Sequence, residues 1–165
     1  MSTPYRLSRY NPSLADRIAC WAVDAAELDA WASLTPEQAG PAVFERWHAE
    51  PSVHAFVLWS DREPCGYGEV WEDDAEAEAE LARIIIDPAI RGQGAGRVLT
   101  GLLVERAREL GYDQIWLRVV PANGAAIACY TAAGMLPAEA SQERSFNAGQ
   151  PREYRWMRAA PPEQS

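Results

Sequence analysis

The sequence of 165 residues contains no lysine, so all fifteen of its basic residues are arginines. They are outnumbered by 24 aspartates and glutamates, which leaves a net charge of -9. Binding to nucleic acid depends on clusters of Lys and Arg that neutralise phosphates, so this balance argues against a nucleic-acid partner. The absence of lysine also excludes a P-loop, because that motif needs a lysine beside the phosphates.

Long apolar runs are also missing. No run approaches the roughly 18 apolar residues of a membrane span, and the first ten residues, MSTPYRLSRY, lack the apolar core of a signal peptide. The three cysteines, Cys20, Cys65 and Cys129, are odd in number and show no metal-binding spacing. We therefore expect a cytoplasmic protein without metal or membrane contact, with reduced thiols of which two or all are buried.

The length fits a single domain, which we place at residues 1–158, with a flexible tail at residues 159–165. The acidic excess has two interpretations that the sequence leaves open. It serves solubility alone, or arginines gather near an anionic cofactor while carboxylates surround a cationic substrate.

The most informative stretch is Leu81–Thr100. An apolar run, Ile84–Ile86, predicts a strand that Asp87-Pro88 ends. Three glycines at alternate positions follow, and then an amphipathic helix that we expect to end at Gly111. The first turn of a helix has unpaired N–H donors, and glycine lets a phosphate approach them closely. This arrangement predicts a site for a phosphorylated cofactor.

A dinucleotide-binding Rossmann fingerprint does not fit this loop. Its pattern, G-x-G-x-x-G, requires a glycine at the sixth position, but counting from Gly92 gives Arg97 and counting from Gly94 gives Leu99. The chain also lacks room for two mononucleotide-binding halves.

Alternation and turn residues predict the remaining elements. We expect a first strand over Tyr5–Tyr10 and a helix capped by Asn11 or Ser13. The other expected elements are helices over Ala25–Ser33 and from Thr35 through Trp47, a hairpin of Val53–Trp59 and Cys65–Trp71, a strand over Gln114–Val120, a helix over Gly124–Ala133 capped by Asn123, and a closing antiparallel pair of Met135–Ser141 and Arg152–Met157 joined by a polar turn region.

Two groups of side chains invite a functional interpretation. Glu76, Glu78 and Glu80 alternate with alanines, which suits an acidic strand face or a solvated hairpin. Glu80 immediately precedes apolar residues, so we expect it to be partly buried, with a raised pKa that makes it a better base. The tryptophans of the N-terminal helices line a pocket or belong to the core: Trp21, Trp31 and Trp47.

The run Arg91-Gly92-Gln93-Gly94-Ala95-Gly96 resembles the Q/R-x-x-G-x-G/A acetyl-CoA loop of the GNAT superfamily of N-acetyltransferases. The order and spacing of elements from about Glu69 to Met135 are also similar to that superfamily. The resemblance implies a single-domain α/β (α+β) fold, with a central mixed, mostly antiparallel sheet of about six to seven strands. Helices flank this sheet, which splays between the strands ending at Asp87 and Val120. It also implies acetyl-CoA as co-substrate.

The resemblance assigns roles to individual residues. Tyr130 matches the tyrosine that protonates the sulfur of coenzyme A, and Glu80 stands where the histone acetyltransferase branch carries its base. The ribosomal-protein N-terminal acetyltransferases have a glutamate on the later strand, where this chain has Arg118, and Glu69 is a reserve base. The cofactor would contact Ile84, Ile85, Ile86, Arg91, Gly92, Gln93, Gly94, Ala95, Gly96, Arg97 and Asn123, the last of which also suits a helix cap.

Three functions follow as hypotheses. The first is acetyl transfer to a primary amine of a small cation, such as a polyamine, an aminoglycoside or an amino-acid derivative. The second is acetylation of a protein N-terminus or lysine, and the third is a non-catalytic acetyl-CoA-binding module. The sequence leaves open whether the protein is a monomer or a homodimer.

Overall fold

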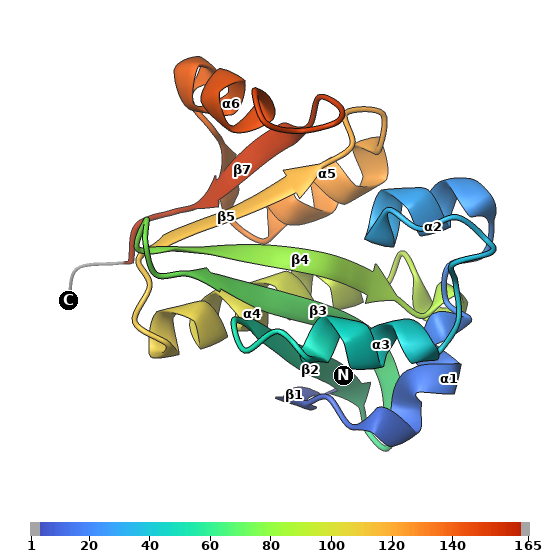
Figure 1. Ribbon diagram of the computed structural model, residues 1–165. Coiled ribbons are helices and arrows are strands. Elements are labelled where there is room, and N and C mark those ends of the chain that lie inside the picture. Colours follow the sequence, from blue (N-terminus) through green and yellow to red (C-terminus); the bar gives the residue numbers. More distant parts are fainter. Residues whose placement is uncertain (1–3, 163–165) are drawn as a thin grey trace.

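The computed structural model describes residues 4–162, which form one seven-stranded sheet with the strand order β1-β2-β3-β4-β5-β7-β6 (Figure 1). The β4–β5 pair is parallel and every other neighbouring pair is antiparallel. The expected fold class is therefore confirmed. The strands are β1 (Tyr5–Arg9), β2 (Val53–Ser60), β3 (Glu63–Asp73), β4 (Glu78–Ile86), β5 (Gln114–Val119), β6 (Met135–Pro137) and β7 (Arg155–Ala159).

The sheet splits between β4 and β5. Their parallel pairing runs from Glu78 opposite Gln114 to Leu81 opposite Leu117 and then stops, and Figure 1 shows the two strands diverging. A bulge lies at the point of divergence: the register against β3 shifts there, and Arg83 has a φ of 49°. Because bulges bend a strand and increase its twist, this one accounts for the turn of β4 away from β5.

Helices cover both faces of the sheet. The long α4 lies behind it in Figure 1, and α3 crosses in front. No helix among residues 4–162 is long and apolar enough to cross a membrane. The helices are the 3₁₀ turns η1 (Pro12–Leu14) and η2 (Pro88–Ile90), and α1 (Ala15–Ala19), α2 (Ala25–Ala32), α3 (Ala42–His48), α4 (Ala95–Glu109), α5 (Gly124–Ala132) and α6 (Ala140–Asn147).

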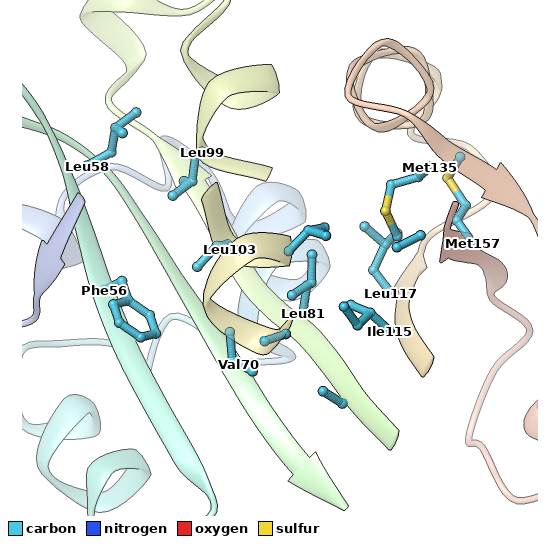
Figure 2. Close-up of a cluster of buried hydrophobic side chains, with 14 of the residues drawn as sticks. Phe56, Leu58, Val70, Leu81, Leu99, Leu103, Ile115, Leu117, Met135 and Met157 are labelled. Carbon is cyan, nitrogen blue, oxygen red and sulfur yellow. The ribbon is translucent and has the colours of Figure 1, made fainter. Parts of the chain in front are cut away.

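Each face has its own hydrophobic cluster. Under α4, the fully buried Leu99 and Leu103 pack on Leu81 of β4 and on β5, and Figure 2 shows Met135 and Met157 extending this cluster. The opposite cluster is built around Phe44 and other aromatic side chains that α1 and α3 press onto the sheet.

The closing strands were predicted wrongly in part. β6 ends at Pro137, β7 begins at Arg155, and the stretch expected to be a turn region contains the helix α6. One aromatic residue anchors this otherwise polar helix: the Phe146 ring lies 5.0 Å from the ring of Trp116 and 4.8 Å from that of Trp156. A single anchor leaves no periodic apolar pattern in the sequence.

Three smaller expectations also need correction. The third N-terminal helix begins at Ala42, because Thr35 opens only a turn and Gly40, with a φ of 137°, interrupts the chain. Ala159, expected in the flexible tail, is a buried residue of β7 that pairs with Met135, whereas residues 163–165 of that tail lie outside the described part. Of the three cysteines only Cys65 is buried, whereas Cys129 is partly buried and Cys20 is exposed, so the expectation of two or three buried thiols is wrong.

Candidate active site

The glycine loop connects η2 to α4 and faces open space. Gly92 and Gly94 have φ of 78° and 90°, which favour glycine, and a Cβ at either would meet nothing within 4 Å. Gly94 is the N-cap of α4, and the backbone N–H groups from Gly92 to Arg97 have no acceptor among the described residues. Such a row of free donors at the positive end of a long helix can bind an anion.

The two arginines of the loop differ. Arg91 points back into the protein: it donates to the Trp21 carbonyl at 2.8 Å and the Ile86 carbonyl at 3.0 Å, and forms an ion pair with Glu27. Arg91 thus connects the loop to α2, and its positive charge is largely neutralised by Glu27. Arg97 is exposed and makes no ion pair with any described residue, so its charge is available beside the free N–H groups.

The second half of β4 has one unpaired backbone edge. Ile85 and Ile86 pair with Tyr67 and Gly66 of β3, but pairing with β5 has already ended at Leu81. An extended chain containing amides can hydrogen-bond to such an edge as an additional short strand. Ile84–Ile86 therefore present a strand edge to which such an extended ligand could add.

The helix α5 lies against α4 on the same side as the loop. Its N-cap is Asn123, whose side chain accepts from the Ala126 N–H at 3.2 Å, so the expected cap is confirmed. Tyr130 packs on the edge of the α4 cluster, and burial together with nearby Cys129 raises its pKa far above the usual range. Tyr130 is thus protonated at neutral pH and can donate a proton.

Glu80 lies on the other face of the sheet, one residue before the split. Its carboxylate accepts a 2.9 Å hydrogen bond from Nε of Arg118, and its side chain is 20% exposed. Burial raises the pKa of Glu80, while Arg118 and Arg83 partly oppose that rise. The expected partial burial and raised pKa are confirmed, and Arg118 holds the carboxylate in place.

Glu69, the reserve base, is fully buried and its oxygens are occupied. It accepts hydrogen bonds from Trp71 Nε1 at 2.7 Å, from Arg83 Nη1 at 2.8 Å and from the Tyr67 hydroxyl. Arg83 in turn stacks between two indoles, 4.0 Å from the Trp47 ring and 4.8 Å from the Trp71 ring. This network fixes the bulge of β4 and leaves Glu69 no access to a ligand.

A cavity of about 660 Å³ opens on the face that carries Glu80. Five aromatic side chains line it, together with six carboxylates and two arginines. The aromatic side chains are Trp47, Trp71, Trp116, Phe146 and Trp156; the carboxylates are Glu50, Glu72, Asp73, Asp74, Glu78 and Glu80; the arginines are Arg46 and Arg83. Its volume is that of a site for a small organic molecule.

The sequence pointed to few of these lining residues. Trp47 does line the cavity. Trp21 instead belongs to the aromatic cluster around Phe44, where it is only 4% exposed, and Trp31 packs against that cluster. Trp116 and Trp156 were overlooked, although seven tryptophans in a chain of this length are themselves a signal. Among the described residues, no group of three or more His, Cys, Asp or Glu could hold a metal ion.

The geometry thus combines three features around one split sheet: an anion-binding loop before α4, an unpaired strand edge, and an acidic aromatic cavity on the opposite face. This combination offers a place for an extended phosphorylated molecule along the split and for a small organic molecule in the cavity.

Residues 19–135 match the model of the Acetyltransferase (GNAT) family, and the chain belongs to that family. Acetyl-CoA is accordingly its co-substrate and N-acetyl transfer its class of reaction. The free N–H groups of the loop and the unpaired edge of β4 fit the pyrophosphate and the amide-containing arm of this molecule.

Curated relatives include the ribosomal protein bS18 alanine N-acetyltransferase of Salmonella typhimurium, which is 32% identical over 117 residues, or 61% of this chain and 77% of the relative. The enzyme of the same name from Escherichia coli K12 is 38% identical over 69 residues, or 42% of this chain and 45% of the relative.

Two solved structures share the fold at low identity. Spermidine N-acetyltransferase from Vibrio cholerae in complex with CoA and spermine has a TM-score of 0.71 at 18% identity, covering 93% of this chain and 92% of that one. Aminoglycoside acetyltransferase AAC(6')-Ib in complex with coenzyme A and kanamycin has a TM-score of 0.71 at 18% identity, covering 95% of each chain.

Proposed function

We propose that this protein moves the acetyl group of acetyl-CoA directly to a primary amine of a small cationic molecule bound in the acidic aromatic cavity. The cavity carries the proposal. Its six lining carboxylates outnumber its two arginines, and one of those, Arg83, is neutralised by Glu69. Carboxylates attract ammonium groups, and tryptophan faces bind them by cation–π contact.

We propose the same cofactor contacts as those expected from the sequence, except that Arg91 supports the loop and does not contact the phosphates. The N–H groups of Gly92, Gln93, Gly94, Ala95, Gly96 and Arg97 would bind the pyrophosphate, and Ile84–Ile86 would pair with the arm. Arg97 supplies the nearby charge, whereas Arg91 supports the loop from behind. Asn123, which caps the helix that carries Tyr130, would be a further contact of the cofactor.

Glu80 and Tyr130 would handle the two protons of the reaction. The amine nitrogen forms a bond to the acetyl carbon while the bond from that carbon to sulfur breaks. Glu80 takes a proton from the amine, directly or through one water, and Tyr130 gives its hydroxyl proton to the departing sulfur. The raised pKa of Glu80 suits its role as a base, and Tyr130 holds the proton that the departing sulfur needs.

The test is release of free coenzyme A thiol with a panel of amines, with mass spectrometry of the product. We expect acetylated product with cationic primary amines and a loss of about 10²- to 10⁴-fold in kcat for Glu80→Gln, with little change in acetyl-CoA affinity. A rate equal to wild type for Glu80→Gln would remove Glu80 from the chemistry.

A second candidate is acetylation of a protein N-terminus, favoured by the names of the curated relatives. A peptide with N-terminal alanine belongs in the panel, beside a lysine peptide. Faster acetylation of either peptide than of every small amine would replace the first proposal. Tight acetyl-CoA binding without any acetyl acceptor would indicate a binding module instead.

We also propose a cytoplasmic location and no nucleic-acid or membrane partner. The protein would be a monomer or a homodimer, with a single domain that extends at least to Ala159 at the end of β7. Size-exclusion chromatography with light scattering decides between the two oligomeric states.

A further inference from the structure

We infer that the acceptor carries a second ammonium group with an oxygen atom next to it, and that Glu78 and Trp116 bind these two groups. This inference rests on the proposed function, since it concerns the same cavity. It selects among small cations, because polyamines contain no oxygen, whereas aminoglycosides and amino-acid amides place oxygen beside nitrogen.

Glu78 supplies the negative charge. It lies on β4 two residues before Glu80, and both residues line the cavity. Two residues along a strand span about 7 Å. No described residue forms an ion pair with the Glu78 side chain, in contrast to Glu80, which Arg118 already holds. The indole N–H of Trp116 interacts with the Glu78 carboxylate and lowers its pKa against the effect of burial, but it brings no positive charge.

The surroundings of Glu78 add negative charge. Burial together with Glu76 and Asp73 raises its pKa, as expected for a carboxylate in need of a cation. Glu72 and Asp74 on the same wall already accept from the Tyr112 hydroxyl. A ligand ammonium beside Glu78 would therefore relieve the repulsion among these carboxylates.

Trp116 supplies the donor for the oxygen. It is 3% exposed, lines the cavity, and its Nε1 is buried without a hydrogen-bond acceptor. It lies close enough to Glu78 to oppose the rise in that residue's pKa, yet makes no hydrogen bond of ordinary geometry with it. The indoles of Trp71 and Trp156 differ, because each has an acceptor within the protein.

A buried donor without an acceptor and an adjacent carboxylate without a cation are complementary to one kind of ligand group. Such a group presents an oxygen to the indole N–H of Trp116 and an ammonium to the carboxylate of Glu78. The indole then gains an acceptor and the carboxylate gains a cation. The amine to be acetylated then lies about two strand residues away, beside Glu80. A chain of five carbons between two nitrogens spans roughly that distance.

Three matched acceptors test the inference: 1-aminopentane, 1,5-diaminopentane and lysinamide. The second adds only the distal ammonium, and the third adds only a carboxamide next to it. For wild type we expect kcat/KM to rise at each step. Glu78→Gln should lower the kcat/KM for the diamine relative to that for the monoamine about 10- to 100-fold. Trp116→Phe should lower the kcat/KM for lysinamide relative to that for the diamine about 2- to 10-fold.

Two control variants separate binding from general effects. Glu76→Gln makes the same change of charge on an exposed turn residue outside the cavity, and Trp59→Phe removes an indole outside the cavity whose N–H already has an acceptor, the Ser8 hydroxyl. Neither control should change the corresponding ratio of kcat/KM values by more than about twofold. If Glu78→Gln and Trp116→Phe change these ratios no more than their control variants do, the inference is overturned.

Calorimetric binding of the same amines to the enzyme with CoA bound gives the comparison without turnover. If transfer is absent but the binding ratios change as expected, the proposed function fails and the subsite stands. If all three amines are acetylated equally well and bind equally well to wild type, the subsite is refuted and the proposed function stands.

Discussion

We predict that Glu69 stabilises the fold through its ion pair with Arg83 and takes no part in catalysis. It is 0% exposed, and its strongest partner is Arg83, whose side chain is 19% exposed. In Glu69→Gln the guanidinium loses its counter-ion while remaining enclosed between the rings of Trp47 and Trp71. Removing one partner of a buried ion pair costs about 3–5 kcal/mol.

That loss is large against the whole stability of a domain, which is about 5–15 kcal/mol. The double variant Glu69→Gln/Arg83→Met removes both charges at once, so it should recover to within about 1–2 kcal/mol of wild type. Urea unfolding followed by circular dichroism measures the free energy of unfolding of wild type, of the two single variants and of the double variant.

Activity of the double variant completes the test. If Glu69 only fixes the bulge, the folded double variant should keep acetyl transfer within about tenfold of wild type, whereas Glu80→Gln should not. Stability of Glu69→Gln within about 1 kcal/mol of wild type would refute the ion-pair reasoning. Because Arg83 lines the cavity and acts on the pKa of Glu80, the activity of the double variant is compared with that of Arg83→Met alone. A stable double variant with no activity beside an active Arg83→Met variant would instead make Glu69 a participant in catalysis.

Three further predictions concern the pH profile, the contact between α4 and α5, and the cysteines. The acidic limb of kcat should lie above the usual range for glutamate, because burial raises the pKa of Glu80 and activity is lost as it becomes protonated; a limb unchanged in Glu80→Gln would contradict this. Gly96→Ala should destabilise by about 1–3 kcal/mol, because its Cβ would lie 2.8 Å from the Cys129 sulfur, and Cys129→Ala should restore stability. The matched Gly101→Ala in α4 meets nothing within 4 Å and should stabilise by about 0.5–1 kcal/mol, so a loss there equal to that of Gly96→Ala in urea unfolding would argue against the contact. In a timed thiol titration at pH 8, exposed Cys20 should react first and Cys65 last, because burial raises the Cys65 pKa to about 11; early reaction of Cys65 would show that its strand opens.

The glycine loop could be predicted from the sequence because its signals are local. Strand, stop, glycines and helix follow one another within twenty residues, and Gly94 and Gly111 have the positive φ that their positions suggest. Asn123 as a helix cap was predictable for the same reason. The direction of Arg91 was not, since its partners lie in the N-terminal helices, far away in the chain.

The cavity could not be predicted, because its walls come from α3, β2, β3, β4, β5, α6 and β7. The helix α6 is held by Phe146 between two tryptophans from different strands, a contact that no local pattern reveals. Glu69 and Glu80 look alike in sequence, as single carboxylates next to apolar residues. Burial and partners separate them: one is enclosed by donors and the other lines a cavity.

One measurement tests the central claim most directly. The protein is incubated with acetyl-CoA labelled in its acetyl group and with 1,5-diaminopentane, and mass spectrometry then locates the label. Direct transfer in the cavity predicts labelled N-acetyl-1,5-diaminopentane in equal amount to the released coenzyme A, with no label on the protein. Labelled acetate as the only product, or label retained on a residue such as Cys129, would contradict the account.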